Sequence, residues 1–259
     1  MRKAVLMAVA AWALAGSAEV PRIIAHRGGS KEQDQNTLAA LRNSYAKGVR
    51  GFEIDVRLTQ DRRIVLMHDD TIEKLTTGKG RVENLTSGEI APVRTRTSGQ
   101  PLPYLEEVLD FLKGAPDSFI QIELKCGKYR EADRTALCEG AVKMVADRGL
   151  ADRVVFICFE PKALKKVKEL SPRQATCLVS DKVGPQLIKT ARAVGAEYLS
   201  VQLNNLYRLF VKDAHKAGLK VTAWTVGSEE DARLAIAMGT DYVTTDIPAA
   251  QLEQKTARP

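Results

Sequence analysis

The sequence alternates short apolar runs with amphipathic segments of helical period, and this alternation restricts the fold more than any other feature. The apolar runs have the length of buried strands and occupy residues 22–26, 51–55, 118–125, 153–159, 175–180, 197–201, 219–226 and 241–245. The amphipathic segments occupy residues 37–47, 105–113, 134–148, 161–169, 185–194, 206–217 and 228–238. Several of them end at glycine, a common helix stop. Eight strands that alternate with helices predict a parallel sheet closed into a (β/α)8 TIM barrel.

The connection after the run 51–55 is too short to contain a helix. A parallel crossover needs about a dozen residues or more, and only 8 residues separate Asp55 from Ile64. The turn that follows Thr59 therefore predicts a β-hairpin, whose second strand runs back from Ile64 to His68. Pairing of Thr59 with Ile64 would place Asp55 roughly opposite His68, to within about two residues, and bring His68 back to the barrel mouth beside the two acids.

One large domain accounts for most of the chain. Its 259 residues suit a single α/β barrel, which commonly has about 250. An open, doubly wound sheet is the alternative, but no Gly-x-Gly-x-x-Gly motif follows the first apolar run. Residues 70–103 are rich in Thr, Gly, Arg and Pro and lack periodicity, so we expect an insertion over the barrel mouth. The expected domain is residues 19–259, and residues 1–18 form a leader.

The N-terminus has the layout of a secretory signal peptide. Arg2 and Lys3 precede an apolar run at residues 4–15, which is short for a transmembrane helix, and residues 16–18 are the small residues of a cleavage site. We therefore expect export to the periplasm or the exterior after cleavage, without stable membrane insertion. A retained helix that anchors the protein in the membrane is the alternative.

The charge and the cysteines exclude several classes of function. Loss of Arg2 and Lys3 lowers the formal net charge from +7 to +5, and the remaining excess is spread along the chain. This distribution suits an anionic small molecule and lacks the basic tracts of a nucleic-acid-binding protein. The four cysteines lack the C-x-x-C spacing of zinc ribbons and thioredoxins. The sequence allows either a disulfide between Cys126 and Cys138 or buried free thiols. It does not determine the oligomeric state.

Acidic residues gather where the expected strands end, which is where the active sites of α/β barrels lie. Glu53 and Asp55 are two residues apart, as are Glu123 and Lys125, so each pair shares one face of its strand. Three carboxylates at one mouth repel each other unless a cation lies between them. We expect Glu53, Asp55 and Glu123 to bind a hard divalent metal ion, Ca²⁺ or Mg²⁺ rather than zinc, because no cysteine or histidine trio accompanies them.

Two of the three histidines, His26 and His68, also end strands at this mouth. Imidazole is well suited to general acid and base catalysis near neutral pH. Arg27 and Lys125 add fixed positive charge, which suits a phosphoryl group. Each residue alone could be structural, as a hydrogen-bonded histidine or a surface ion pair. Their shared position predicts metal-assisted phosphodiester chemistry.

Four further residues have weaker assignments. Trp224 ends the seventh expected strand and is either a core aromatic or a platform for the carbon skeleton of the substrate. His215 lies at a helix C-terminus, where the helix dipole favours a cation, so we interpret it as structural. Asp61 belongs to the hairpin turn, and Asp69 either orients His68 or is exposed.

Five blocks of the sequence resemble the glycerophosphodiester phosphodiesterase family and occur in the same order. They are IIAHRGG at 23–29, GFEIDVRLTQDRRIVLMHDDTI at 51–72, IELK at 122–125, AWTV at 223–226 and DYVTTDIP at 241–248. The resemblance implies an irregular TIM barrel with a divalent metal held by Glu53, Asp55 and Glu123. It implies that His26 and His68 are the acid–base pair. It further implies a small-molecule substrate, a glycerophosphodiester, hydrolysed to glycerol 3-phosphate and an alcohol.

Two positions depart from the pattern of this family. The family commonly has Pro-Glu-Asn-Thr before the first helix, where this chain has Asp34-Gln35-Asn36-Thr37. Asn36 and Thr37 keep the capping chemistry, but Gln35 replaces an acid by a neutral amide. Lys74 stands where arginine is usual and lacks its bidentate geometry. The alternative functions are a related barrel phospholipase acting on sphingomyelin or lysophospholipids, and a non-catalytic barrel that binds phosphate or sugar.

Overall fold

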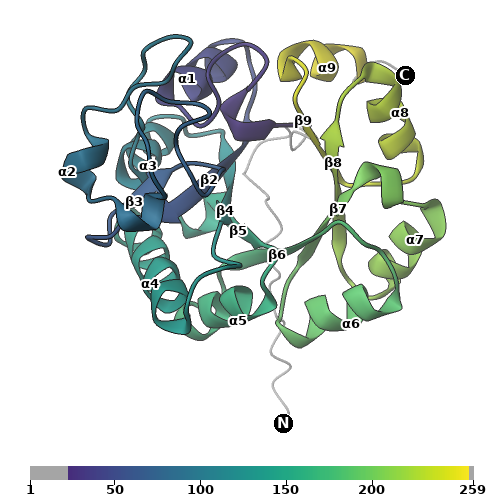
Figure 1. Ribbon diagram of the computed structural model, residues 1–259. Coiled ribbons are helices and arrows are strands. Elements are labelled where there is room, and N and C mark those ends of the chain that lie inside the picture. Colours follow the sequence, from purple (N-terminus) through teal and green to yellow (C-terminus); the bar gives the residue numbers. More distant parts are fainter. Residues whose placement is uncertain (1–22, 257–259) are drawn as a thin grey trace.

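The computed structural model describes residues 23–256 and forms a closed α/β barrel (Figure 1). Its parallel strands are β1 (Ile23–Ala25), β2 (Gly51–Leu58), β4 (Phe119–Leu124), β5 (Val154–Cys158), β6 (Ala175–Ser180), β7 (Tyr198–Gln202), β8 (Lys220–Val226) and β9 (Tyr242–Thr245). They pair in the order β1-β9-β8-β7-β6-β5-β4-β2, and β1 closes the ring on β2 through Ala25 and Phe52. The predicted TIM barrel is confirmed. The expected leader, residues 1–18, lies outside the described residues.

Helices surround the strands as an outer ring (Figure 1). They are α1 (Leu38–Ala46), α3 (Leu105–Lys113), α4 (Glu131–Asp147), α5 (Pro161–Leu170), α6 (Pro185–Ala193), α7 (Arg208–Lys216), α8 (Glu229–Ala237) and α9 (Ala249–Thr256). The sequence pattern predicted seven of these and missed α9. It also started α4 three residues late, because the first turn is polar and the apolar period begins only after it. The acids in that turn, Glu131 and Asp133, favour a helix N-terminus by their charge. Within the described residues, no helix is long and apolar enough to cross a membrane.

The barrel interior is filled at one end and polar at the other. Phe119, Tyr198 and Tyr242 are the first residues of their strands, and their side chains are buried inside the ring. Tyr242 makes edge-to-face contacts with the other two, at ring-centroid distances of 6.0 and 6.3 Å. This apolar plug closes the amino end of the barrel, so polar side chains inside the ring collect at the carboxyl ends of the strands.

A tight turn connects β2 to the short strand β3 (Ile64–Leu66), which is antiparallel to β2. The backbone N–H of Thr59 donates to the carbonyl of Arg63 at 2.8 Å, and that of Arg62 donates to Thr59 at 3.0 Å. Arg62 has φ of 63°. A three-residue loop with its last residue in the left-handed region is a common hairpin connection. The predicted hairpin is present, and Thr59 pairs with Arg63.

This turn shifts the expected register by one residue. Asp55 lies opposite Met67, whose backbone N–H donates to the Asp55 carbonyl at 3.1 Å. The expected pairing, with Asp55 roughly opposite His68, is therefore one residue off, because it assumed a four-residue loop. His68 follows one residue later, just beyond the paired part of the hairpin, and its side chain turns toward the barrel mouth.

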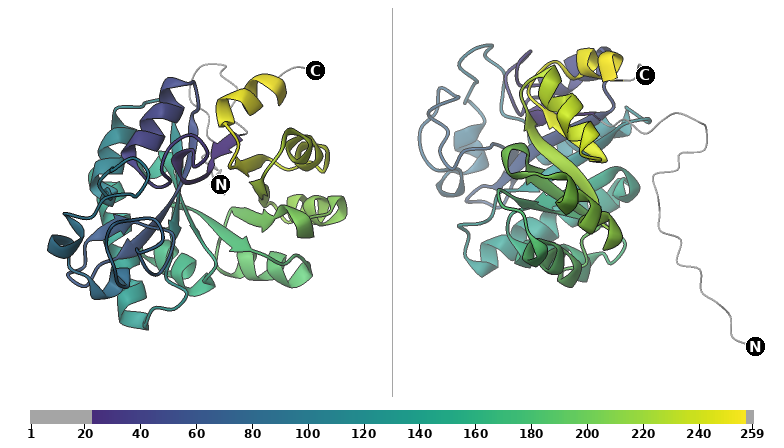
Figure 2. Two further views of the ribbon diagram at one scale, coloured as in Figure 1. Left: turned by 45° about the horizontal axis from the view of Figure 1, so that its top comes forward. Right: turned by 90° about the vertical axis from the view of Figure 1, so that its right-hand side faces the viewer.

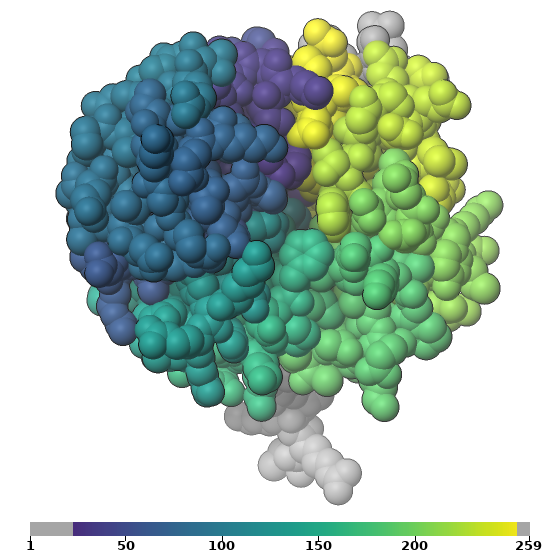
Figure 3. Space-filling model, in the orientation of Figure 1, coloured from purple at the N-terminus to yellow at the C-terminus, as the bar shows by residue number. Residues whose placement is uncertain are grey.

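Residues 70–103 pack against β3 and extend the carboxyl-terminal face of the barrel (Figure 2). The segment contains the short helix α2 (Ser87–Ile90) and several isolated β-bridges. Its apolar side chains join two from the hairpin in a small core made of Val65, Met67, Ile72, Val82, Ile90, Val93 and Leu102. In Figure 3 this blue segment borders one side of the barrel mouth, facing the green and yellow C-terminal half.

Candidate active site

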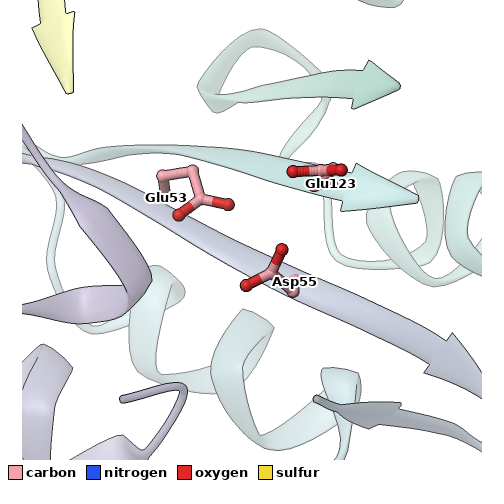
Figure 4. Close-up of side chains that lie close together, drawn as sticks. All are labelled: Glu53, Asp55 and Glu123. Atoms are coloured by element: carbon pink, nitrogen blue, oxygen red, sulfur yellow. The ribbon is translucent and has the colours of Figure 1, made fainter. Parts of the chain in front are cut away.

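Three carboxylates from two neighbouring strands converge at the barrel mouth (Figure 4). Glu53 and Asp55 follow one another along β2, and Glu123 lies on β4. The parallel register places Asp55 directly beside Glu123. Each residue offers one oxygen such that the three oxygens lie within 4.8 Å of one another. The structure therefore brings together the three residues that the sequence predicted as metal ligands.

Glu53 is almost fully buried beside the first strand. Its Oε2 accepts a hydrogen bond from the backbone N–H of Arg27 at 2.9 Å and lies 3.8 Å from Nε2 of His26. Burial and the nearby charge of Asp55 raise the pKa of Glu53 to about 8. Among residues 23–252, no hydrogen-bond donor contacts its second oxygen, Oε1.

Asp55 is also buried but is surrounded by donors. Asn36 binds it twice: its amide nitrogen donates to Asp55 Oδ2 at 2.9 Å, and its side-chain oxygen accepts from the Asp55 backbone N–H at 3.0 Å. Lys125 Nζ and Arg27 Nε lie 3.5 Å from the two carboxylate oxygens. Burial alone would raise the pKa of Asp55, but Lys125, His68 and these other groups lower it.

Lys125 connects the second and third carboxylates. Its ammonium donates to Glu123 Oε1 at 2.9 Å and lies near Asp55. Burial would lower the pKa of Lys125, but the charges of Asp55 and Glu123 raise it, so the side chain stays protonated. Burial and Asp55 raise the pKa of Glu123.

These carboxylates fit a hard divalent cation. The donor set is all oxygen, as Ca²⁺ and Mg²⁺ prefer. Glu53 Oε1 is buried without a hydrogen-bond donor among the described residues, and Asp55 Oδ1 has only the Lys125 ammonium at 3.5 Å. A buried carboxylate oxygen without a hydrogen-bond partner is costly, and a bound cation would remove that cost. The cluster is therefore consistent with a divalent metal.

His26 is anchored from the far end of the chain. It follows β1 directly, and its Nδ1 donates to Asp246 Oδ1 at 2.6 Å. Ser30 Oγ donates to the same oxygen at 2.8 Å. Burial would lower the pKa of His26, but the hydrogen bond to Asp246 and the charge of Glu53 outweigh it and raise the pKa. The anchor at Nδ1 leaves Nε2 facing Glu53.

His68 is anchored locally and through its backbone. Its Nδ1 donates to Asp69 Oδ1 at 2.7 Å, so Asp69 orients the ring, the first of the two expected options. Arg57, buried on β2, donates to the His68 carbonyl at 2.7 and 3.1 Å and to Asp70 at 2.8 Å. Burial lowers the pKa of His68.

A cavity of about 200 Å³ joins these groups at the barrel mouth. One wall holds His26, Arg27, Glu53, His68, Glu123 and Lys125. The opposite wall is largely apolar and includes Ile157, Phe159, Val179 and Trp224. Phe159 and Trp224 meet edge to face at 5.8 Å between ring centroids. Trp224 therefore lines the cavity, where it can contact a ligand.

Three residues that shape this site were missed by sequence reasoning, or were given another role. Asp246 binds His26, and Arg57 binds the backbone carbonyl of His68. Asn36 binds Asp55. Asp246 belongs to the block DYVTTDIP, and Arg57 continues the alternate row of Glu53 and Asp55, so both had a signal in the sequence. We expected Asn36 to cap a helix; only Thr37 does so, accepting from Ala40 N–H at 3.1 Å.

The remaining candidates lie away from the cavity. His215 Nε2 donates to Asp241 at 2.9 Å on the outer surface, as expected for a structural histidine. Asp61 accepts a hydrogen bond from Thr59 Oγ1 in the hairpin turn at 2.6 Å. All four cysteines are buried free thiols, and Cys126 Sγ lies 3.7 Å from Cys158 Sγ rather than beside Cys138.

Residues 26–250 match the model of the glycerophosphoryl diester phosphodiesterase family. A glycerophosphodiester phosphodiesterase from Caldanaerobacter subterraneus is 30% identical over 232 residues, which cover 87% of this chain and 94% of that protein. The chain belongs to the glycerophosphoryl diester phosphodiesterase family. Members of this family are enzymes, and so is this protein.

Another relative agrees in length, and two solved structures agree in fold. A glycerophosphodiester phosphodiesterase from Bacillus altitudinis is 27% identical and covers 88% of this chain and 95% of its own. The crystal structure of a glycerophosphodiester phosphodiesterase from Parabacteroides distasonis aligns with a TM-score of 0.81 at 27% identity, over 92% of this chain and 98% of that one. An Oleispira antarctica phosphodiesterase, solved with the product sn-glycerol-3-phosphate, aligns with a TM-score of 0.85 at 24% identity over 92% and 98%, and shows the same fold.

Gln35 and Lys74 are the departures from the expected family pattern that the sequence indicates. Arg27 donates to the side-chain oxygen of Gln35, so a neutral amide contacts the guanidinium on this side. Lys74 is exposed on the segment 70–103. Neither residue belongs to the carboxylate cluster or contacts a catalytic histidine candidate.

Proposed function

We propose that this enzyme hydrolyses glycerophosphodiesters to glycerol 3-phosphate and an alcohol, with a bound divalent cation, Ca²⁺ or Mg²⁺, and two catalytic histidines. The observation that carries the proposal is the convergence of His26, which follows β1, and His68, which follows the hairpin, on one carboxylate cluster. A binding protein has no need of two imidazoles beside such a cluster. The product complex of the Oleispira antarctica phosphodiesterase supports the choice of substrate.

Glu53, Asp55 and Glu123 would hold the cation. When bound, it would offset negative charge on the phosphoryl oxygens as a Lewis acid. Arg27 and Lys125 contribute fixed positive charge to the same cavity wall, close to the carboxylates that keep them in place. The apolar wall with Trp224 and Phe159 suits the carbon skeleton of the glycerol group.

The two histidines then exchange protons in two steps. In the first, one imidazole takes the proton of the glycerol hydroxyl next to the phosphate ester, and that oxygen attacks phosphorus. The other imidazolium gives its proton to the alcohol oxygen as the P–O bond to the leaving group breaks, which leaves a cyclic phosphate. In the second step a water molecule opens the ring with the two roles reversed. Asp246 and Asp69 each hold one Nδ1, so Nε2 of each ring is available for this transfer.

An assay of glycerol 3-phosphate release from glycerophosphoethanolamine and glycerophosphocholine tests the proposal. We expect release with Ca²⁺ or Mg²⁺, loss of release on chelation, and recovery when the metal is returned. His26→Ala and His68→Ala should each lower kcat by at least about 100-fold, in the usual range for an acid–base group. His215→Ala is the matched control, because this third histidine lies outside the cavity, and it should keep full activity.

The alternatives predict different outcomes. Faster turnover of micellar lysophospholipid or sphingomyelin than of soluble diesters would favour a phospholipase. Phe159, directly after β5, and Tyr207 and Leu209, at the start of α7, are exposed, which gives this option some apolar surface. Ligand binding without turnover, unchanged in His68→Ala, would favour a non-catalytic barrel.

We further propose that residues 1–18 direct export and are cleaved. The support is the sequence pattern of the leader alone. Sequencing of the mature N-terminus from the exported fraction tests this, and a chain that retains Met1 there would contradict it.

A further inference from the structure

A second cavity, of about 160 Å³, lies next to the one described above. It is formed between the loop that follows β1 and the segment 70–103. Ser30, Asp34 and Gln35 line it from the loop, and Lys74, Arg96 and Thr97 line it from the segment. None of these residues belongs to the carboxylate cluster. The cavity is lined mainly by polar and charged side chains, unlike the apolar wall of the first.

Two hydrogen-bonded links connect this cavity to the candidate catalytic groups. Gln35 lines the second cavity and accepts from Arg27, which lines the first. Ser30 also lines the second cavity, and it donates to the carboxylate of Asp246 that holds His26. The two cavities are therefore adjacent on the Arg27 and His26 side. A phosphodiester at Arg27 would have its second ester arm within reach of this cavity.

The two cationic side chains of the second cavity, Lys74 and Arg96, have nitrogen atoms free to bind an anion. Among the described residues, Lys74 makes no ion pair or hydrogen bond. Arg96 uses only Nε, which donates to the Glu73 carbonyl at 3.0 Å, so its two terminal nitrogens remain for a ligand. The acid Asp34 is already satisfied: its Oδ2 accepts from Thr95 Oγ1 at 2.6 Å and from the Ser98 backbone N–H at 2.9 Å.

We propose that the second cavity binds the leaving alcohol of the diester and favours alcohols that carry a negatively charged group, a carboxylate or a phosphate. This inference rests on the proposed function, whose substrates differ only in this alcohol. Lys74 and Arg96 supply the two cations that would recognise the anionic group. They make no contact with the residues that would carry out the chemistry, so they act on the choice of substrate.

Gln35 strengthens this preference. A carboxylate at position 35 would pair with Arg27 and place a negative charge on the boundary between the two cavities. The neutral amide keeps its hydrogen bond to Arg27 without that charge. An anionic alcohol therefore meets the cations Arg27, Lys74 and Arg96, and the acid that lines the second cavity, Asp34, has its Oδ2 engaged by Thr95 and Ser98.

A pair of substrates that differ by one carboxylate tests the proposal. Glycerophosphoserine is glycerophosphoethanolamine with a carboxylate added to the alcohol, so the ratio of their kcat/KM values isolates that group. We expect the full-length mature enzyme to favour glycerophosphoserine. The double variant Lys74→Ala/Arg96→Ala should lower the ratio about fivefold or more, as expected for two partly exposed ion pairs. Gln35→Glu should also lower the ratio, because it adds a negative charge between the two cavities.

A matched control removes the same charge elsewhere. Lys79→Ala/Lys113→Ala deletes two exposed cations, one on the segment 70–103 and one on α3, both outside the two cavities. This control should leave the ratio unchanged. An equal fall in the control and in the Lys74/Arg96 variant would show a general effect of net charge and would overturn the proposal.

The remaining outcomes separate the subsite from the proposed function. If both substrates are cleaved but the wild-type ratio is near one, or does not respond to Lys74→Ala/Arg96→Ala, the subsite is wrong and the function stands. If neither substrate is cleaved, the proposed function fails, and calorimetric binding of the same two diesters decides the subsite. Tighter binding of glycerophosphoserine that depends on Lys74 and Arg96 would support it, and equal binding would overturn it.

Discussion

The two candidate catalytic histidines are held by carboxylates of very different origin. His68 is oriented by its sequence neighbour Asp69, whereas His26 is held by Asp246, 220 residues away. Hydrogen bonding to His26 lowers the pKa of Asp246 to about 2, so this carboxylate stays ionised at neutral pH. A charged partner fixes the ring and its tautomer more firmly than a neutral one. Asp246 is a positioning residue for His26.

Replacement of Asp246 should therefore impair turnover more than substrate binding. Asp246→Ala should lower kcat by about 10- to 100-fold with a smaller change in KM, by analogy with other supporting carboxylates. Asp246→Asn keeps an acceptor and should fall between this variant and the wild type. Because the Asp246 charge raises the pKa of His26, both variants should lower that pKa, which NMR titration of the ring can measure. Equal kcat values in all three proteins would contradict the role.

Glu53 makes the metal-free enzyme sensitive to pH. Its pKa in the folded protein, about 8, lies above the ordinary value of 4.5, so the folded state holds a proton that the unfolded state releases. Stability therefore falls as the pH rises from about 4.5 to 8. The cause is burial next to Asp55, and the effect is confined to protein without bound cation.

Glu53→Gln should remove this dependence. In chelator, we expect the variant to melt several degrees above the wild type at pH 8 and with a much smaller difference at pH 5. Added Ca²⁺ should raise the Tm of the wild type more than that of the variant, because the variant has one charged ligand fewer. Thermal melts at both pH values, with and without Ca²⁺, measure this; a pH-independent difference between the two proteins would contradict it.

At the scale of elements, β2 and its hairpin assemble half of the site. Glu53, Asp55 and Arg57 alternate along β2, and the tight turn returns the chain so that Arg57 reaches the His68 carbonyl. The sequence predicted the hairpin and the shared face of the two acids from spacing alone. It did not predict the register to the residue, because a single left-handed residue in the turn shifts every pair.

Arg57→Ala should destabilise the protein and displace His68. The partly buried His68 carbonyl would lose both hydrogen bonds from Arg57, which costs about 1–3 kcal/mol of unfolding free energy. Denaturant unfolding measures this loss, and kcat should fall in the same variant. Arg63→Ala is the control on the same hairpin: Arg63 is exposed and pairs with Glu106, so its loss should cost at most about 1 kcal/mol and spare kcat. Equal losses in both variants would contradict a special role for Arg57.

At the scale of the whole molecule, the packed apolar groups and the candidate catalytic groups occupy different parts of the barrel. The aromatic plug fills the amino end, a large apolar layer lies between strands and helices, and the charged groups occupy the carboxyl end. The four cysteines belong to the packed parts and are fully enclosed. Burial raises the pKa of Cys138 to about 12, so its thiol is neutral and unreactive.

The native enzyme should therefore resist thiol reagents. We expect little reaction with a water-soluble aromatic disulfide reagent in the folded state and rapid reaction of 4 thiols per chain after unfolding in guanidinium chloride without reductant. Prior reduction is the control and should give the same count. A count of 2 without reductant would show a disulfide, for which Cys126 and Cys158 are the nearest pair.

The sequence by itself determined the barrel, the hairpin and the seven ionisable residues expected at its mouth. These follow from hydrophobic period, connection length and two-residue spacing, which are local properties of the chain. Only the tertiary structure decided which distant groups contact these residues. Asp246 binds His26, Asn36 binds Asp55, and Lys74 and Arg96 line the second cavity. Closure of the ring brings β9 next to β1, and no local pattern encodes a contact across so many residues. The physical reason is that packing, unlike period, depends on the whole chain at once.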